Sequence, residues 1–149
     1  MKIAICLSGL IGSTAKGGKG KNIDYKITKK YFKKNLYQND IKIDYFFHCW
    51  KNKFEKDILE LYSPKIHKFE KPIIKNNNLT DKEYGAISKN YSNKKSVELK
   101  SLYEKKNNFT YDLVILTRFD ILILKKLNLK DLFKNKFYVV GPKKHHGSR

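Results

Sequence analysis

Short apolar runs alternate with longer amphipathic stretches along the chain, and this alternation restricts the fold more than any other feature of the sequence. The apolar runs predict strands at residues 2–8, 43–50, 65–70, 112–117 and 136–142. The stretches between them predict helices at residues 23–37, 53–62 and 91–108, with one helical turn at 127–133. Because strands separated by helices usually pair in parallel, we expect an α/β fold whose mostly parallel sheet is flanked by helices.

Local signals indicate where these helices begin and end. The helix at 23–37 repeats apolar residues at helical spacing and directs a lysine-rich face outwards. The helix at 53–62 ends before Pro64, because the residue that precedes a proline disfavours helical geometry. Ser92 is of a type that caps helices, so the third helix is expected to begin there and residues 71–85 to form a loop.

The size and apolar content of the chain set the class of protein. A length of 149 residues is that of one domain, so residues 1–149 are expected to form a single unit. No stretch reaches the roughly 20 apolar residues that span a bilayer, and no clear signal-peptide cleavage site follows the apolar N-terminal run. We therefore expect a cytoplasmic protein without a transmembrane segment. Cys6 and Cys49 lie in predicted strands and are expected to be buried thiols.

The net charge of +19 makes a nucleic-acid-binding protein one alternative. Of the 33 basic residues, only Arg118 and Arg149 are arginine, the residue that makes bidentate contacts to bases. The lysines are spread along the chain and accompany many Asn, Ile, Tyr and Phe residues, which share A/T-rich codons. Genome composition can produce this bias, so no specific nucleic-acid partner is expected.

Polar residues follow three of the predicted strands directly. Ser8 and Gly9 end the first strand, His48 to Trp50 end the second, and Arg118 to Asp120 follow the fourth. Because ligands of open parallel sheets bind at the carboxyl ends of the strands, these residues are candidates for a ligand site. For His48 and Trp50, a position at the edge of the core is the favoured alternative.

Asp120 is the strongest candidate metal ligand in the chain. A carboxylate at a strand end can bind Mg²⁺ or Mn²⁺, which prefer oxygen ligands and bridge phosphates. The alternative is an ion pair with Arg118, because residues two apart in an extended segment point the same way. The spacing of the residues leaves both interpretations open.

The segment YDLVILTRFDILIL, residues 111–124, resembles a segment of viral and bacterial proteins related to GT-A-type glycosyltransferases. KIAICLSG resembles their opening strand, DYFFHCW their second strand and LYSPK the approach to their third strand. The likeness extends from residue 2 to about residue 147. It implies a Rossmann-like fold of GT-A type that binds a nucleoside-diphosphate sugar and transfers the sugar to an unknown glycan, lipid or protein acceptor.

The resemblance also implies roles for individual residues. Asp120 stands where the last aspartate of the D-x-D motif binds Mn²⁺ or Mg²⁺. Arg118 replaces the first acidic residue of that motif, and would contact the nucleotide or orient Asp120. Ser8 and Gly9 match the turn that faces the nucleotide. Gly12 stands near the place where the relatives carry an arginine, which is a departure from their pattern.

The C-terminal sequence GPKKHHGSR is a second departure from this family. In the relatives, the last strand leads through a histidine-containing stretch to an acceptor-binding half, and no such half follows here. His145 and His146 are candidates for a phosphate or metal site, and a tail without a role is the alternative. The resemblance identifies no catalytic base. An active transferase, a truncated relative and an inactive binding module all stay open.

Overall fold

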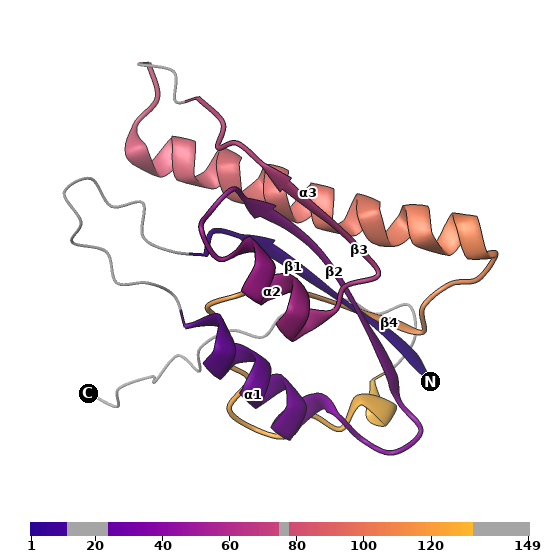
Figure 1. Ribbon diagram of the computed structural model, residues 1–149. Helices are drawn as coiled ribbons and strands as arrows, with labels where there is room; N and C mark the ends of the chain where they lie inside the picture. The colour runs from indigo at the N-terminus through magenta and orange to yellow at the C-terminus, as the bar shows by residue number, and fades with distance from the viewer. Residues whose placement is uncertain (12–23, 75–77, 133–149) are drawn as a thin grey trace, which may run out of the picture.

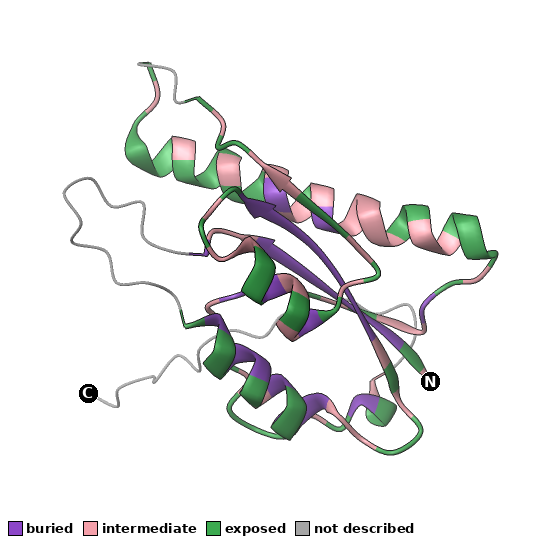
Figure 2. Cartoon of the chain, viewed as in Figure 1, coloured by how far each residue is buried: buried purple, intermediate pink, exposed green. Residues whose placement is uncertain are grey.

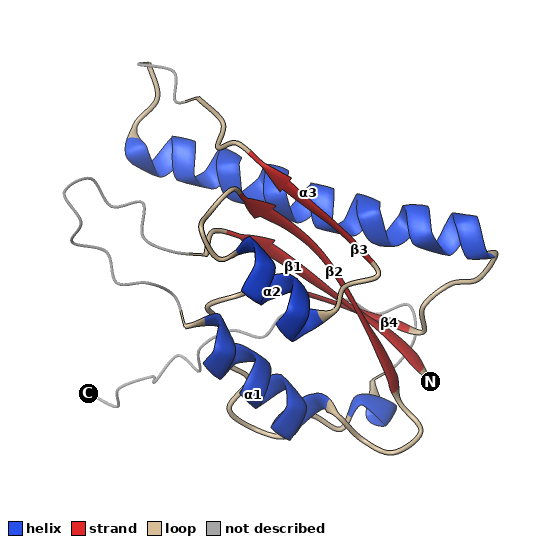
Figure 3. Ribbon diagram, viewed as in Figure 1, coloured by secondary structure: helices blue, strands red, loops and turns tan. Residues whose placement is uncertain are grey.

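The structure is a computed structural model in which residues 1–11, 24–74 and 78–132 are described. The strands are β1 (Lys2–Gly9), β2 (Lys42–Trp50), β3 (Ile66–Glu70) and β4 (Leu113–Arg118). The helices are α1 (Tyr25–Leu36), α2 (Glu55–Tyr62), α3 (Asp81–Asn107) and the short 3₁₀ helix η1 (Leu129–Asp131). The strands form one all-parallel sheet of order β3-β2-β1-β4, with helices on both faces (Figures 1 and 3). The predicted α/β fold with a parallel sheet is therefore confirmed.

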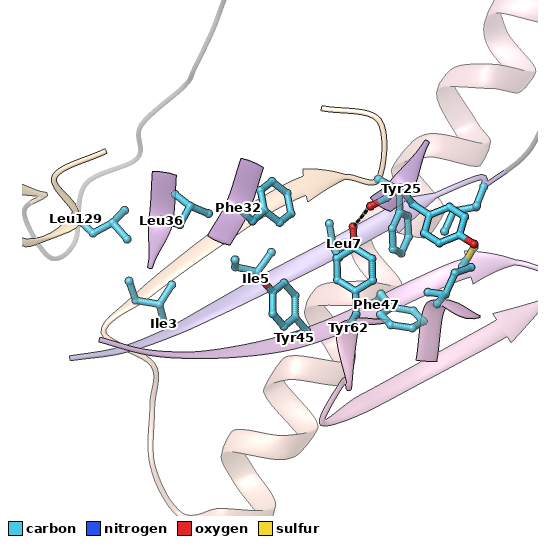
Figure 4. Packing of buried hydrophobic residues seen from close by; sticks show 14 residues of the cluster. Ile3, Ile5, Leu7, Tyr25, Phe32, Leu36, Tyr45, Phe47, Tyr62 and Leu129 are labelled. Carbon is cyan, nitrogen blue, oxygen red and sulfur yellow. Dashed lines mark hydrogen bonds between the residues drawn. The ribbon is translucent and has the colours of Figure 1, made fainter. Parts of the chain in front are cut away.

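The two faces of the sheet receive different helices because side chains alternate along β1. Ile3, Ile5 and Leu7 point towards α1 and α2, where they join the larger apolar cluster (Figure 4). Ala4 and Cys6 point the other way and lie in a smaller cluster with residues of α3. The central strands β1 and β2 are consequently buried on both faces (Figure 2), as is typical of parallel sheets.

The larger cluster is rich in aromatic residues. Tyr45 and Tyr62 meet edge to face with ring centroids 5.4 Å apart. The Tyr62 hydroxyl donates a hydrogen bond of 2.9 Å to the carbonyl of Tyr25, shown as a dashed line in Figure 4. This bond joins the end of α2 to the start of α1, so the two helices are fixed to each other as well as to the sheet.

The predicted start of the third helix is wrong. Helix α3 begins at Asp81, and its N-cap is Thr80, which forms a capping box with Glu83. The Thr-x-x-Glu pattern at 80–83 is the sequence signal for this start. Ser92, which was expected to cap the helix, lies in its middle and is fully buried.

The other elements agree closely with the predicted ranges. The helical turn expected at 127–133 is the 3₁₀ helix η1, and the strand expected at 136–142 lies outside the described residues. Cys6 and Cys49 are buried free thiols, as predicted, and burial raises the pKa of each to about 12. Within the described ranges, the helices are all too short or too polar to cross a membrane.

Candidate functional site at the carboxyl edge of the sheet

The three sequence features predicted at strand ends meet at one edge of the sheet. Ser8 is the register partner of His48 on β2 and of Arg118 on β4, and Gly9 is the partner of Cys49. Parallel pairing places the carboxyl ends of all four strands together. The predicted neighbourhood of Ser8, Gly9, His48 and Arg118 is therefore confirmed, whereas their roles towards a ligand stay predictions.

Ser8 is buried and bonded to its protein neighbours. Its hydroxyl lies within hydrogen-bonding distance of Oδ1 of Asn93 on α3, and 3.4 Å from the carbonyl oxygen of Thr117 on β4. These contacts hold the end of β1 between α3 and β4. A ligand reaching Ser8 would have to replace one of them.

Gly9 occupies a backbone conformation that few other residues adopt. Its φ angle is +106°, and a Cβ atom added there would have no heavy atom within 4 Å. Backbone conformation, not lack of space, therefore favours glycine at this position. The Gly9 N–H donates a 2.8 Å hydrogen bond to Oγ of Ser92, so this backbone donor is already used.

Arg118 and Asp120 form a two-point ion pair. Nε of Arg118 donates to Oδ1 of Asp120 over 2.8 Å, and a second guanidinium nitrogen donates to Oδ2. This is the arrangement that the spacing offered as the alternative to metal binding. The two side chains are 44% and 28% exposed, so the pair is accessible to a solute at the sheet edge.

His48 lies at the centre of a hydrogen-bonded network beside this edge. Its Nδ1 is 2.8 Å from Oγ of Ser92, and its Nε2 is 2.9 Å from Oε2 of Glu70. The Tyr91 hydroxyl donates to the same oxygen of Glu70 over 3.0 Å, and Lys68 pairs with the other oxygen. The network therefore links β2 and β3 to α3.

The protonation states in this network follow from burial and hydrogen bonding. The pKa of Glu70 is lowered to about 2, chiefly by its hydrogen bond with Lys68 and also by those from His48 and Tyr91. The pKa of His48 is lowered because burial disfavours the charged ring, although Glu70 acts in the opposite direction. At neutral pH we therefore assign a neutral His48 whose Nε2–H donates to the Glu70 carboxylate. Nδ1 then accepts from the Ser92 hydroxyl.

Ser92, His48 and Glu70 have the residue types and contacts of a nucleophile, a base and an orienting carboxylate. Ser92, however, is fully buried in the middle of α3, and its hydroxyl also accepts the N–H of Gly9. A hydroxyl in this position does not reach a substrate. The arrangement stabilises the junction of β1, β2 and α3.

The aromatic residues at the end of β2 belong to the edge of the core, as the favoured interpretation predicted. Trp50 is buried and stacks on Tyr91 with ring centroids 5.7 Å apart and planes 15° apart. His48 meets the Trp50 ring edge to face at 4.8 Å. The Trp50 ring is therefore covered by protein and not exposed as a platform for a sugar.

The described residues form an open groove beside this edge but no group of metal ligands. The groove has a volume of about 630 Å³ and lies between α3 and β4. It reaches the edge at Asn93 and then follows Val97, Leu102 and Leu116 away from it. Among the described residues, no three His, Cys, Asp or Glu side chains are grouped as metal ligands. His145 and His146 lie outside the described part of the chain.

Comparison of the chain with models of protein families, with curated proteins and with solved structures found no match. The resemblance to GT-A-type glycosyltransferases thus stays a prediction from the sequence segments quoted above. The fold is compatible with a Rossmann-like protein, and it defines the class as an α/β protein with a parallel sheet.

Proposed function

We propose that the protein binds a nucleoside-diphosphate sugar at the carboxyl edge of the sheet and acts in glycosyl transfer. The observation that carries this proposal is the accessible pair of Arg118 and Asp120 at the carboxyl end of β4, the edge strand that pairs with the central strand β1. The pair combines a planar cation suited to phosphate with a carboxylate suited to a divalent ion. Both groups suit a diphosphate, the arginine directly and the carboxylate through a bound ion.

The residues present fit a divalent ion that arrives together with the diphosphate. Mg²⁺ sites in nucleotide enzymes commonly use one or two protein carboxylates, with the remaining ligands from phosphate and water. Asp120 would supply that carboxylate. The ion would neutralise charge on the leaving diphosphate.

Arg118 would exchange partners when the diphosphate binds. In the free protein its guanidinium satisfies Asp120 through two parallel hydrogen bonds. A phosphate oxygen accepts the same donors in the same bidentate geometry. Release of Asp120 towards the ion and capture of phosphate by Arg118 are therefore coupled, and each change favours the other.

A binding module without transferase activity is the second candidate, and one observation favours it. In the free protein Asp120 is fully engaged by Arg118, which stands where the related glycosyltransferases carry an acid. A protein that uses Arg118 alone for phosphate would bind a nucleotide without a divalent ion. Hydrolysis of the nucleotide sugar in the absence of an acceptor would separate an active transferase from such a module.

The test is thermal unfolding with a panel of nucleoside-diphosphate sugars and free diphosphates, with and without Mn²⁺. A ligand at about 100 times its Kd adds about 2.7 kcal/mol to the free energy of unfolding. For a domain of this size, that raises the Tm by roughly 5–10 °C. The expected result is a shift with one nucleotide that depends on Mn²⁺.

Two variants decide which residues bind. Asp120→Asn is expected to abolish the Mn²⁺-dependent part of the shift, and Arg118→Gln to weaken binding with and without Mn²⁺. Asp40→Asn is the matched control, because Asp40 has an exposed side chain, precedes β2 at the opposite edge, and has a positive φ angle that asparagine tolerates. An unchanged Mn²⁺-dependent shift in Asp120→Asn would refute the metal assignment. No shift with any ligand would refute the proposed function.

A further inference from the structure

Exposed apolar side chains gather around α1 and the segment that follows β4. In residues 119–127, Ile121, Leu122 and Leu124 are 46%, 41% and 68% exposed, and on α1 Ile27 is 43% exposed. Singly exposed apolar residues are ordinary, whereas a group of them marks an interaction surface.

Hydrogen bonds show that the two segments lie side by side. The Thr28 hydroxyl donates to the carbonyl of Phe119 over 2.6 Å, and the N–H of Leu127 donates to the carbonyl of Asn35 over 3.1 Å. The segment therefore follows α1 along its length, as the orange trace beside α1 shows in Figure 1. Phe119 is buried in the core, so the segment is anchored at its start.

Helical geometry places Ile27 next to this segment on the solvent side. Thr28 and Asn35 face the segment, and each residue advances about 100° around a helix. Ile27 and Lys34 each precede one of these contact residues by a single step, and they lie on the neighbouring strip of the surface. Ile27 is thus exposed on the side of α1 along which the segment runs.

Exposed lysines accompany the apolar residues on both segments. They are Lys30 and Lys34 on α1, with Lys125 and Lys126 on the segment that follows β4. Lys26 and Lys33 are exposed too, but each precedes a contact residue by two steps and points to the other side of α1. Within residues 24–38 and 119–127, the acidic side chains are Asp24 and Asp120, and Asp120 is paired with Arg118. We call the four lysines Lys30, Lys34, Lys125 and Lys126, together with Ile27, Ile121, Leu122 and Leu124, the basic apolar face.

We propose that the basic apolar face docks on an anionic membrane surface. Proteins that lie on bilayers commonly combine exposed apolar side chains with lysines, because the apolar groups enter the headgroup region while the lysines attract anionic lipids. The net charge of +19 adds a long-range attraction to the same surface. A nucleic acid would use the lysines but has no need of the exposed leucines. The inference does not depend on the proposed nucleotide site.

Vesicle flotation of the full chain tests this proposal. The probes are vesicles of phosphatidylcholine alone and vesicles with about one-third phosphatidylserine. We expect binding to the mixed vesicles to be at least about tenfold tighter than to phosphatidylcholine alone, and to weaken as the salt concentration rises. No binding to the mixed vesicles would overturn the proposal.

Paired variants assign the binding to this face. Leu122→Ser with Leu124→Ser, and separately Lys30→Gln with Lys34→Gln, should each weaken binding by about tenfold. Leu102→Ser with Lys106→Gln is the matched control, because these exposed residues lie on α3, across the sheet, and binding should not change. The altered residues are exposed, so the Tm of each variant should equal that of the parent.

Two results would contradict the assignment to a membrane. An equal loss of vesicle binding in the α3 control would show that exposed lysines and apolar residues contribute to binding wherever they lie on the surface. Vesicle binding that is unaltered by the leucine changes, together with equally tight binding to duplex DNA, would indicate a simple polyanion partner for the lysines.

Discussion

Oγ of Ser92, in the middle of α3, lies 2.8 Å from Nδ1 of His48 on β2. The same hydroxyl oxygen accepts the N–H of Gly9 on β1. One side chain therefore connects the longest helix to the ends of both central strands. The candidate ligand site begins at these strand ends, so its geometry depends on Ser92, which does not itself reach the solvent.

Ser92→Ala should lower the free energy of unfolding by about 1–3 kcal/mol, because it leaves the partly buried N–H of Gly9 and the buried Nδ1 of His48 without their partner. Ser96→Ala is the control. Ser96 is equally buried on the same helix, but its hydroxyl donates to the carbonyl of Asn93 within that helix. Urea unfolding of both variants measures the difference. Equal losses would show that the connection between α3 and the strands contributes nothing beyond burial.

Two glycines make a second comparison. Gly9→Ala should destabilise the protein by about 1–2 kcal/mol despite the free space around Gly9, because its φ of +106° is unfavourable for alanine. Gly85→Ala should stabilise it by up to about 1 kcal/mol, because Gly85 lies within α3 with open space around it and alanine favours a helix. Thermal unfolding measures both changes, with a lower Tm expected for Gly9→Ala and a higher Tm for Gly85→Ala. Stabilisation by both changes would contradict the strained conformation at Gly9.

The strands were predictable because buried parallel strands are continuous apolar runs, and β1 and β2 are of this kind. The start of α3 could not be predicted in the same way, because Gly85 and a run of polar residues favour a loop at 71–85. The capping box of Thr80 and Glu83 nevertheless starts the helix at Asp81. Placing the N-cap at Ser92 also concealed the tertiary role of that residue.

The candidate site could be predicted in its position but not in its network. Ser8, Gly9, His48 and Arg118 were found by one rule, that carboxyl ends of parallel strands meet. Glu70 ends the predicted strand 65–70, so the same rule could have found it. The contacts of Ser92 arise from how α3 lies across the sheet, which local sequence patterns do not specify.

The stability of the protein should decrease as the pH falls from 7 to 5. The folded-state pKa of His48 is lowered, so the unfolded chain binds a proton that the folded protein resists. The associated stability is complete above the unfolded pKa of about 6.5 and is lost below it, by up to about 1.4 kcal/mol per pH unit. Glu70, with a pKa of about 2, affects stability only below about pH 4.5.

His48→Gln should reduce this slope of stability against pH between 7 and 5. His67→Gln is the control. Partial desolvation lowers the pKa of His67 as well, although most of its side chain is exposed. His67 also lacks the hydrogen bonds that His48 makes with Ser92 and Glu70. The measurement is urea unfolding at a series of pH values. If His67→Gln reduced the slope more than His48→Gln, the assignment of the titration to His48 would be wrong.

Lys29 should change the stability of the protein at alkaline pH. This residue of α1 is buried, with Nζ 3.7 Å from the centre of the Tyr45 ring, and burial lowers its pKa to about 8. The contact with the Tyr45 ring favours the charged amine, whereas burial, and next the charge of Lys33, disfavour it and lower the pKa. Because the unfolded lysine has a pKa of about 10.4, the folded protein releases this proton first. The contribution of Lys29 to stability should therefore rise between about pH 8 and pH 10, by at most about 1.4 kcal/mol per pH unit. Cys6 and Cys49 act in the opposite direction above their unfolded pKa of about 8.5, because burial raises the folded pKa of each to about 12.

Lys29→Met should remove that contribution while filling the same space, so its stability relative to the parent protein should fall as the pH rises from 8 to 10. Lys26→Met, on the exposed side of α1, should leave it in place. The buried tyrosines Tyr45 and Tyr62 do not contribute below pH 10, because burial raises the pKa of each. Their ionisation in the unfolded chain lowers stability only above the ordinary tyrosine pKa of about 10. Urea unfolding of both proteins from pH 7.5 to 9.5 isolates the lysine as a difference, because Cys6 and Cys49 are common to both. An equal change of stability with pH in Lys29→Met and in the parent protein would show that Lys29 does not release the proton.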